Sequence, residues 1–164
     1  MKEMFFGCKN IIIIDLDFTK YNAKNVKNMS RMFSDCKSLT KANLVNFNTL
    51  NLTNIEGMFA NCTSLKAVKP SNFNTSYVRN MSKLFSNCIF LKEVIFKNFI
   101  TREAYNMEEM FYKCKLLEDI DISNFEINNL KKMKCMFSFC PEKLQKKIKN
   151  QKLGFKAEAF DVKI

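Results

Sequence analysis

The sequence predicts an α/β solenoid, in which the chain winds through successive coils and each coil adds one short strand to a parallel β-sheet. The first observation is that six of the seven cysteines occupy one position of a repeat. The second is that a Met-Phe or Leu-Phe pair recurs in step with them. The third is that each repeat contains helix-like spacing followed by strand-like spacing of apolar residues. A unit this short cannot bury its apolar face alone, so neighbouring copies must share a core.

The repeat is 26 residues long, and its first copy is two residues longer, between Phe18 and Met29. Nine of the ten methionines fall in two rows of the repeat, so position rather than composition places them. Coils stacked at roughly 4.8 Å would turn equivalent residues into ladders inside a dry core. The main rows are Phe5, Phe33, Phe59, Phe85, Phe111 and Phe137; Ile11, Leu39, Leu65, Leu91 and Leu117; and Met29, Ile55, Met81, Met107 and Met133.

The first half of each repeat predicts a short helical turn. Met29, Met32, Phe33 and Cys36 follow the spacing i, i+3, i+4, i+7, which is one face of a helix. An asparagine stands just before each such run, where its side chain can accept hydrogen bonds from exposed amides as an N-cap. These asparagines are Asn28, Asn54, Asn80 and Asn106.

The second half of each repeat predicts a strand that is buried on one side. Two inward positions alternate in each copy, as in a half-buried strand. They are Ala42 and Leu44, Val68 and Pro70, Val94 and Phe96, and Ile120 and Ile122, which gives about five strands with the first copy. Pro70 cannot donate to a ladder and should weaken its strand. An Asn-Phe pair then turns the chain, at 46–47, 72–73, 98–99 and 124–125, and its asparagines could form a buried ladder.

The stretch MFANCTSLKAVKPSNFNTSYVRNMSKLF, at residues 58–85, resembles the BspA-like leucine-rich repeat family, also called the DUF285 group. The resemblance covers about residues 4 to 140, with departures in the first copy, at Pro70 and after Cys140. It implies a right-handed leucine-rich-repeat coil with its sheet on the concave face and short helical turns on the convex face. It also implies a surface or secreted protein, mostly bacterial, associated with adhesion to cells and matrix proteins, and it carries over no catalytic residues.

The chain divides into a repeat array at residues 1–140, with five to six copies, and a C-terminal basic helical cap or tail at residues 141–164. Pro141 suits a helix start, and Leu144 and Ile148 lie one helical turn apart. We expect this segment to cover the core of the last coil, and a basic helix touching a membrane or nucleic acid is the alternative. The start lacks a comparable segment, so the first coil either follows further coils or pairs with another molecule.

The cysteine spacing argues against a zinc site, because zinc ligands come in pairs two to four residues apart. Stacked cysteines would hold their Cβ atoms about 4.8 Å apart, slightly too far for an unstrained disulfide. Small, buried, free thiols are therefore the favoured interpretation, with disulfides and metal binding as alternatives. Cys135 stands outside the register, between core rows, and is predicted to be an exposed, reactive thiol.

Composition limits the function classes. Histidine is absent, and no nucleophile motif or phosphate-binding glycine loop occurs, which predicts a protein that is not an enzyme and holds no cofactor or metal. The formal net charge of +11 favours acidic partners, but no nucleic-acid-binding motif accompanies it. The sequence has no apolar stretch long enough for a transmembrane helix and no recognisable signal peptide. The resemblance predicts a surface or secreted location, and the cytoplasm is the alternative.

The outward strand positions form the predicted binding face, because the inward rows are committed to the core. They are basic in the middle coils and acidic in the last full coil, which suits a docking surface for a partner of complementary charge. We predict a non-catalytic platform for a protein or glycan. An intracellular scaffold and nonspecific binding to anionic surfaces are the alternatives, and the oligomeric state is left open. The candidate residues are Lys41, Asn43, Lys66, Lys69, Lys92, Glu93, Lys97, Glu118, Asp119 and Asp121.

Overall fold

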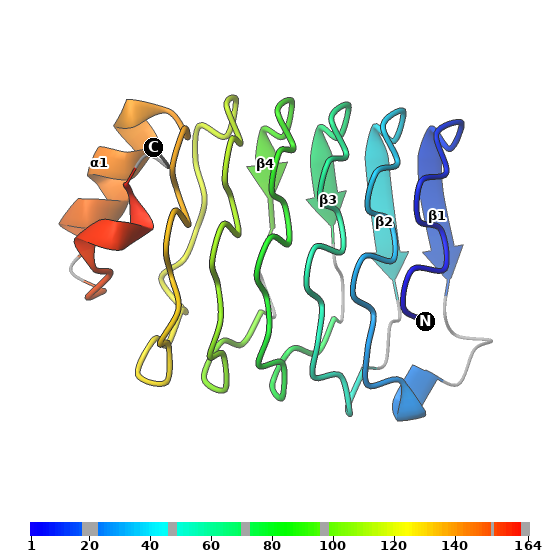
Figure 1. Ribbon diagram of the computed structural model, residues 1–164, viewed down its shortest axis with the longest axis horizontal. Coiled ribbons are helices and arrows are strands. Elements are labelled where there is room, and N and C mark those ends of the chain that lie inside the picture. Colours follow the sequence, from blue (N-terminus) through cyan, green and yellow to red (C-terminus); the bar gives the residue numbers. More distant parts are fainter. Residues whose placement is uncertain (18–22, 46–48, 70–72, 96–98, 152, 162–164) are drawn as a thin grey trace.

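The computed structural model describes residues 1–17, 23–45, 49–69, 73–95, 99–151 and 153–161. The coils stack along the long axis, with the N-terminus at the β1 end and helix α1 at the other (Figure 1). One parallel sheet runs in the order β1-β2-β3-β4. In its register Ile13 lies beside Lys41, Lys41 beside Ala67 and Ala67 beside Glu93. The strands are β1 (Ile13–Asp17), β2 (Lys41–Val45), β3 (Ala67–Lys69) and β4 (Glu93–Val94).

The predicted phenylalanine ladder is confirmed. The rings of Phe59 and Phe85 are stacked with centroids 5.7 Å apart, and the Phe85–Phe111 separation is also 5.7 Å. The stack extends to Phe5 at one end and Phe137 at the other. The methionine and leucine rows lie in the same core, and the inward strand positions Ala42, Leu44, Val68, Val94, Ile120 and Ile122 are buried with them. Pro70 and Phe96 lie outside the described residues.

The cysteine row forms a second ladder of free thiols, held by hydrogen bonds between coils. The Sγ of Cys62 donates to the carbonyl of Phe33 at 3.0 Å, one coil earlier. The same carbonyl accepts the amide of Cys36 at 3.3 Å within its own coil. A thiol therefore fills a tight corner and also gives a buried carbonyl its second hydrogen bond, which alanine could not do. The other members of this pattern are Cys36, Cys88, Cys114 and Cys140.

These buried thiols predict a loss of stability at alkaline pH. Burial raises the pKa of Cys36 to about 11 and that of Cys140 to about 12, and it holds the pKa of Cys88 well above 9.0. The folded protein thus keeps protons that the unfolded chain releases, so the free energy of unfolding falls as pH rises above about 9. Each such thiol contributes up to about 1.4 kcal/mol per pH unit over this window.

The measurement is urea unfolding in reductant at pH 8 and pH 10, for the wild type and for Cys88→Ala. We expect the wild type to lose about 1 kcal/mol more than the variant between the two pH values. The variant starts from a lower stability at both pH values, so the comparison uses only the change with pH. Equal losses would contradict a Cys88 thiol that stays neutral in the fold.

The predicted short helix in each repeat is wrong, and a run of tight turns takes its place. The amide of Phe33 donates to the carbonyl of Met58 in the next coil at 2.9 Å, instead of to a carbonyl one turn back. Two residues per coil adopt left-handed backbone, such as Arg31 (φ 55) and Asp35 (φ 62), and these break helical propagation. The helix-like spacing of Met29, Met32, Phe33 and Cys36 therefore reflects inward-pointing turn residues, all of them buried.

The asparagines before these turns accept amide hydrogen bonds as expected, but they close turns rather than cap helices. The Oδ1 of Asn28 accepts the amide of Ser30 at 2.8 Å, and the later members repeat the contact. The backbones of this row also form a column of parallel bridges from Asn28 through Asn54, Asn80 and Asn106 to Lys132. This column is a second line of coil-to-coil pairing, apart from the sheet.

A threonine row forms a third polar ladder, on the side where the strands end. Thr49, Thr75 and Thr101 are buried, and the Oγ1 of Thr75 donates to the carbonyl of Ile100 at 2.8 Å. The neighbouring Asn-Phe row buries Phe73, Phe99 and Phe125, whereas Asn124 is exposed and does not join a buried asparagine ladder. Asn46, Asn72 and Asn98 lie outside the described residues.

The described part of the sheet has four strands rather than about five, because the coil after β4 has no strand there. In the coil after β4, the inward residue Ile120 continues the buried row of Val68 and Val94. The amide of Ile120 donates at 2.7 Å to Oδ1 of Asp119, its own neighbour. This local hydrogen bond competes with the ladder and explains why the sheet stops.

The C-terminal segment lies against the last coil (Figure 1). Helix α1 (Glu142–Asn150) begins directly after Pro141 and buries Leu144 and Ile148. The short 3-10 helix η3 (Ala157–Ala159) takes the place of a further coil, because Ala159 accepts the amide of Phe137 at 2.7 Å. Phe160 stacks on Phe137 with centroids 5.5 Å apart, as a further rung would. The division at residue 140 stays a prediction, and these contacts support it.

The structure shows where the lengthened first copy and Cys135, the cysteine outside the register, lie at the two ends of the array. The extra residues of the first copy hold a 3-10 helix, η2 (Ala23–Asn25). The prediction that Cys135 is an exposed thiol is wrong. Its side chain is buried and its backbone is left-handed. Its amide donates to the carbonyl of Glu158, in the C-terminal segment, at 2.7 Å. The C-terminal segment covers this position, which the repeat pattern alone did not show.

Candidate functional site

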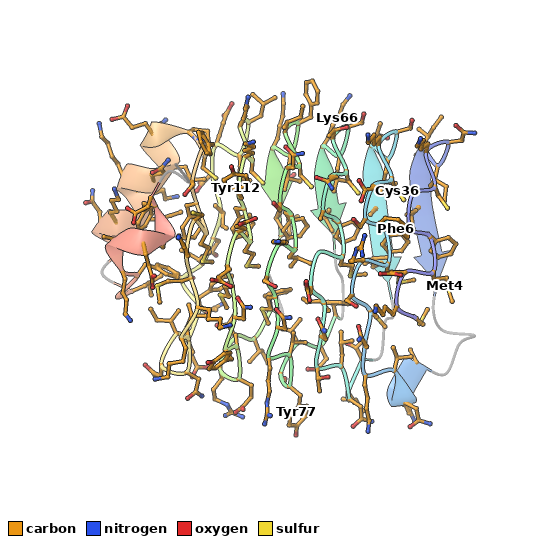
Figure 2. The ribbon with its side chains drawn as sticks, in the orientation of Figure 1. Met4, Phe6, Cys36, Lys66, Tyr77 and Tyr112 are labelled. Atoms are coloured by element: carbon orange, nitrogen blue, oxygen red, sulfur yellow. The ribbon has the colours of Figure 1, made fainter. Side chains whose placement is uncertain are left out.

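The outward side chains of the sheet form a continuous surface, here called the sheet face, and nine of the ten predicted residues are described on it or directly beside it. Asn43 is half-buried and the other eight are exposed; Lys97 lies outside the described residues. The parallel register places Lys41, Ala67 and Glu93 in one row, and Asn43 and Lys69 in the next. In Figure 2, Lys66 and Tyr77 lie at opposite edges of the array.

Charge changes sign along the sheet face. The basic part is formed by β2, β3 and the residue before β4. Acidic residues flank it on both sides: Asp15 on β1, and those of β4 and the following coil. The amide of Asn43 donates to Oδ1 of Asp15 at 2.9 Å, so neighbouring rows are linked by their side chains. The basic residues are Lys41, Lys66, Lys69 and Lys92, and the acidic ones are Glu93, Glu118, Asp119 and Asp121.

The structure brings three of the predicted residues together around a hollow of about 500 Å³, which we call the acidic hollow. It opens where the ladder ends after β4. The predicted lysines do not line it. Its lining residues are Glu93, Val94, Ile95, Asp119, Ile120, Asp121 and Asn124.

Helix α1 supplies a counter-charge at the edge of the acidic hollow. Lys147 donates to Oδ1 of Asp119 at 2.5 Å. This hydrogen bond, with a smaller contribution from the Ile120 amide, holds the pKa of Asp119 below its ordinary value. Hydrogen bonds from the hydroxyl and amide of Ser123 lower the pKa of Asp121. Both carboxylates are therefore ionised at neutral pH, and that of Asp119 is already paired with the ammonium group of Lys147.

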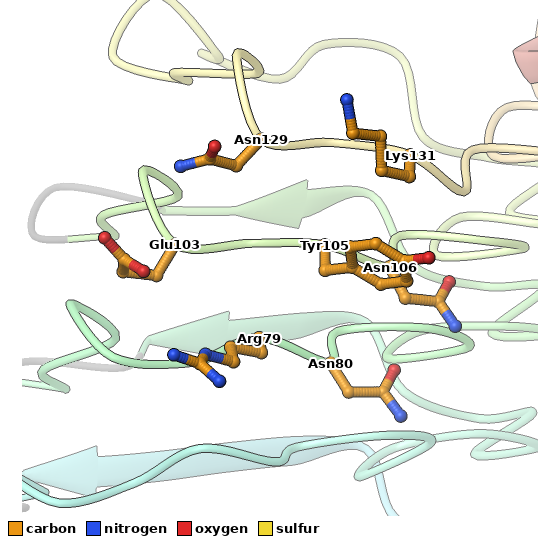
Figure 3. Close-up of a pocket in the computed structure, with 7 residues that line it drawn as sticks. All are labelled: Arg79, Asn80, Glu103, Tyr105, Asn106, Asn129 and Lys131. Carbon is orange, nitrogen blue, oxygen red and sulfur yellow. The ribbon is translucent and has the colours of Figure 1, made fainter.

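A second hollow, of about 490 Å³, lies beside the asparagine bridge column and was missed by sequence reasoning. We call it the tyrosine groove. In Figure 3 Tyr105 lies between Arg79 and Lys131, with Glu103 and Asn129 on one side of this row and Asn80 and Asn106 on the other. Arg79, Tyr105 and Lys131 share one repeat position, so the 26-residue step could have revealed the row. Their chemical types differ, however, and only apolar rows were conspicuous.

No helix in the described residues is long and apolar enough to cross a membrane. Within the same residues, no group of three or more Cys, Asp or Glu side chains is arranged to hold a metal ion.

Comparison with solved structures gives the class of protein. The chain superposes on a leucine-rich repeat protein from Eubacterium ventriosum ATCC 27560 with a TM-score of 0.53 and 17% identity, over 84% of this chain and 33% of that one. A leucine-rich repeat protein from Bacteroides ovatus ATCC 8483 matches with a TM-score of 0.42 and 21% identity, over 87% and 40%. The first of these matches shows that the protein has a leucine-rich-repeat fold. The chain covers less than half the length of each of the two proteins.

The family is shown directly by sequence. The family described as "Mycoplasma protein of unknown function, DUF285" matches residues 1–71 and 66–159, and the chain belongs to it. This confirms the BspA-like resemblance seen in the repeat. A comparison with curated proteins finds no match.

Proposed function

We propose that the protein is a non-catalytic binding platform that holds a protein or glycan partner on its sheet face. The observation that carries the proposal is that the inward positions of each coil keep their residue types while the outward positions vary. The inward rows repeat the same residue types from coil to coil, whereas the outward strand positions change from Lys to Glu and Asp. Side chains that vary on a rigid, regular scaffold are free to serve recognition.

The charge gradient indicates what kind of partner would fit. A surface that is acidic at Asp15 on β1, basic over β2 and β3 and acidic again beyond β4 favours a partner that is negative in the middle and positive at both ends. We include in the proposal a right-handed coil with its sheet on the concave side. We also propose that the protein is exposed on a cell surface and takes part in adhesion to cells or matrix proteins. The family resemblance supports this part of the proposal.

The test uses two variants of equal net charge. Lys41→Glu with Lys69→Glu cancels the net charge of the four lysines that form the basic part of the sheet face. Lys27→Glu with Lys143→Glu, both at exposed positions away from it, is the matched control. Binding is measured on immobilised matrix proteins and on a glycan array. For a ligand that the wild type captures, we expect the sheet-face variant to lose at least about tenfold in affinity while the control stays within about twofold.

An equal loss in both variants would show that binding follows net charge alone. Unchanged binding in the sheet-face variant would place the binding surface elsewhere. A neutral-salt titration separates these cases further, because charge-only binding vanishes at moderate ionic strength.

A further inference from the structure

The tyrosine groove has the composition of a ligand site rather than of an ordinary solvated face. Tyr105 is 49% exposed, and cations flank it one coil before and one coil after. Arginine is rare in this chain, which has three Arg among 27 basic residues, yet Arg79 lines the groove and Arg102 lies beside it. Exposed tyrosine together with arginine is the combination most enriched at binding hot spots.

Backbone hydrogen bonds fix the geometry of the groove. The carbonyl of Arg79 accepts the amides of Tyr105 at 2.9 Å and Asn106 at 3.0 Å. The carbonyl of Tyr105 accepts the amides of Lys131 at 3.0 Å and Lys132 at 3.1 Å. The two cations therefore stand two coils apart, roughly 10 Å at the usual strand spacing, with the ring between them. The backbone of the site is therefore fixed before any ligand binds.

The two cations are also available for an anion. Within the described part of the chain, the ion pairs do not include Arg79 or Lys131. The one carboxylate of the groove, Glu103, lies 4.0 Å from Nε of Arg102. The groove thus offers two unpaired positive charges, one partly neutralised carboxylate and the side-chain amide of Asn106. The amides of Asn80 and Asn129 already donate to Glu56 and to the carbonyl of Arg102.

We propose that the tyrosine groove binds a carboxylate-bearing sugar of an acidic glycan. The apolar face of the sugar ring packs on Tyr105, and its carboxylate pairs with one of the two cations that flank the tyrosine, Arg79 or Lys131. Hydroxyl groups both donate and accept: Glu103 can accept from them, and the Nδ2 of Asn106, whose Oδ1 accepts the Glu108 amide, can donate to them. An acidic peptide anchor would instead favour a deep, desolvated apolar pocket, which this open polar hollow does not provide. The groove lies apart from the sheet face, so either site can fail without the other.

The test uses trigalacturonate and its methyl ester, which share a sugar skeleton but differ in charge, with inorganic triphosphate as a probe of charge alone. Binding is followed by nuclear magnetic resonance titration at millimolar ligand. We expect trigalacturonate to bind more tightly than the ester and the triphosphate. Tyr105→Ala and Arg79→Gln should each weaken it by up to about tenfold. The matched controls, Phe90→Ala and Lys143→Gln at exposed positions that belong to neither row of the groove, should leave it unchanged.

Three results would overturn the proposal. The first is the absence of any trigalacturonate shift in the folded wild type. The second is equal binding of triphosphate with no effect of Tyr105→Ala, which would indicate charge alone. The third is preferential binding of a short poly-glutamate peptide that depends on Tyr105, which would assign the groove to an acidic protein. Circular dichroism of each variant confirms that it is folded before its titration is interpreted.

Discussion

Replacing Phe59 by Ala is expected to lower the free energy of unfolding by about 3–5 kcal/mol. The ring is 2% exposed and stacks on Phe33 at 5.4 Å and on Phe85 at 5.7 Å, so its removal leaves a cavity inside the ladder. The rigid coils on both sides are tied by backbone hydrogen bonds and cannot close around the cavity. For a chain of this size, a loss of this magnitude is a large part of the total stability.

Urea unfolding followed by circular dichroism measures this effect. The matched control is Phe90→Ala, because Phe90 is 49% exposed and its removal should change the free energy by no more than about 0.5 kcal/mol. Similar small effects for both variants would contradict a shared phenylalanine core. A variant with a lower m-value as well would indicate that the array unfolds in blocks, as stacked repeats can.

The double replacement Leu144→Ala with Ile148→Ala is expected to destabilise the protein by about 4 kcal/mol or more. These two side chains are the buried residues of α1, and they anchor the segment whose η3 pairs with the last coil. Losing them would expose the core around Phe137 to water. The same experiment tests whether residues 141–164 act as a cap, since a loosely attached tail would tolerate both changes.

Hydrogen exchange adds a local readout to this prediction. The amide of Phe137 donates to Ala159 and should exchange faster in the double variant, whereas the amide of Phe59, which donates to Leu84, should be less affected. Lys143→Ala, an exposed change on the same helix, is the control. Unchanged stability and exchange in the double variant would show that the last coil does not depend on this segment.

The sequence was most informative where identical residue types recur. Phe33 through Phe137, the cysteines and the leucines share a step of 26 residues, and stacking at that step requires a common interior. The parallel sheet and the inward rows followed from this. The stacked coils and the parallel sheet could therefore be predicted before any coordinates, and the leucine-rich-repeat class was implied by the resemblance of residues 58–85 to a known family.

The local conformation between the rows could not be predicted in the same way. Helical spacing and inward-facing turns place the same side chains on one side, and only hydrogen bonding between coils separates them. Glycine would have signalled left-handed backbone, but each of the two left-handed rows contains a single glycine, Gly57 in one and Gly7 in the other, and larger residues such as Arg31 occupy the remaining positions. The burial of Cys135 and the missing fifth strand depend on contacts with Glu158 and Asp119, which no repeat pattern contains.

The candidate site was predictable only in part, for a related reason. Outward strand positions can be identified from alternation alone, so the sheet face was found. The tyrosine groove lies outside the strands and joins residues of unlike chemistry from three coils. Its row exists in the sequence at Arg79, Tyr105 and Lys131, but its meaning depends on the hollow that surrounds it.

The 26-residue step has a consequence for how such a gene can change. The hydrogen bonds of the cysteine and turn ladders join each coil to the adjacent one, as between Cys62 and Phe33 or between Phe33 and Met58. Duplication or loss of DNA encoding one whole winding would therefore leave every rung matched, whereas a single inserted codon would misalign everything downstream of it within that winding. Excising the winding that contains Tyr105 would bring Arg79 beside Lys131. Recombination of whole repeats could thus change the exposed residues while the buried rows of the core stay the same.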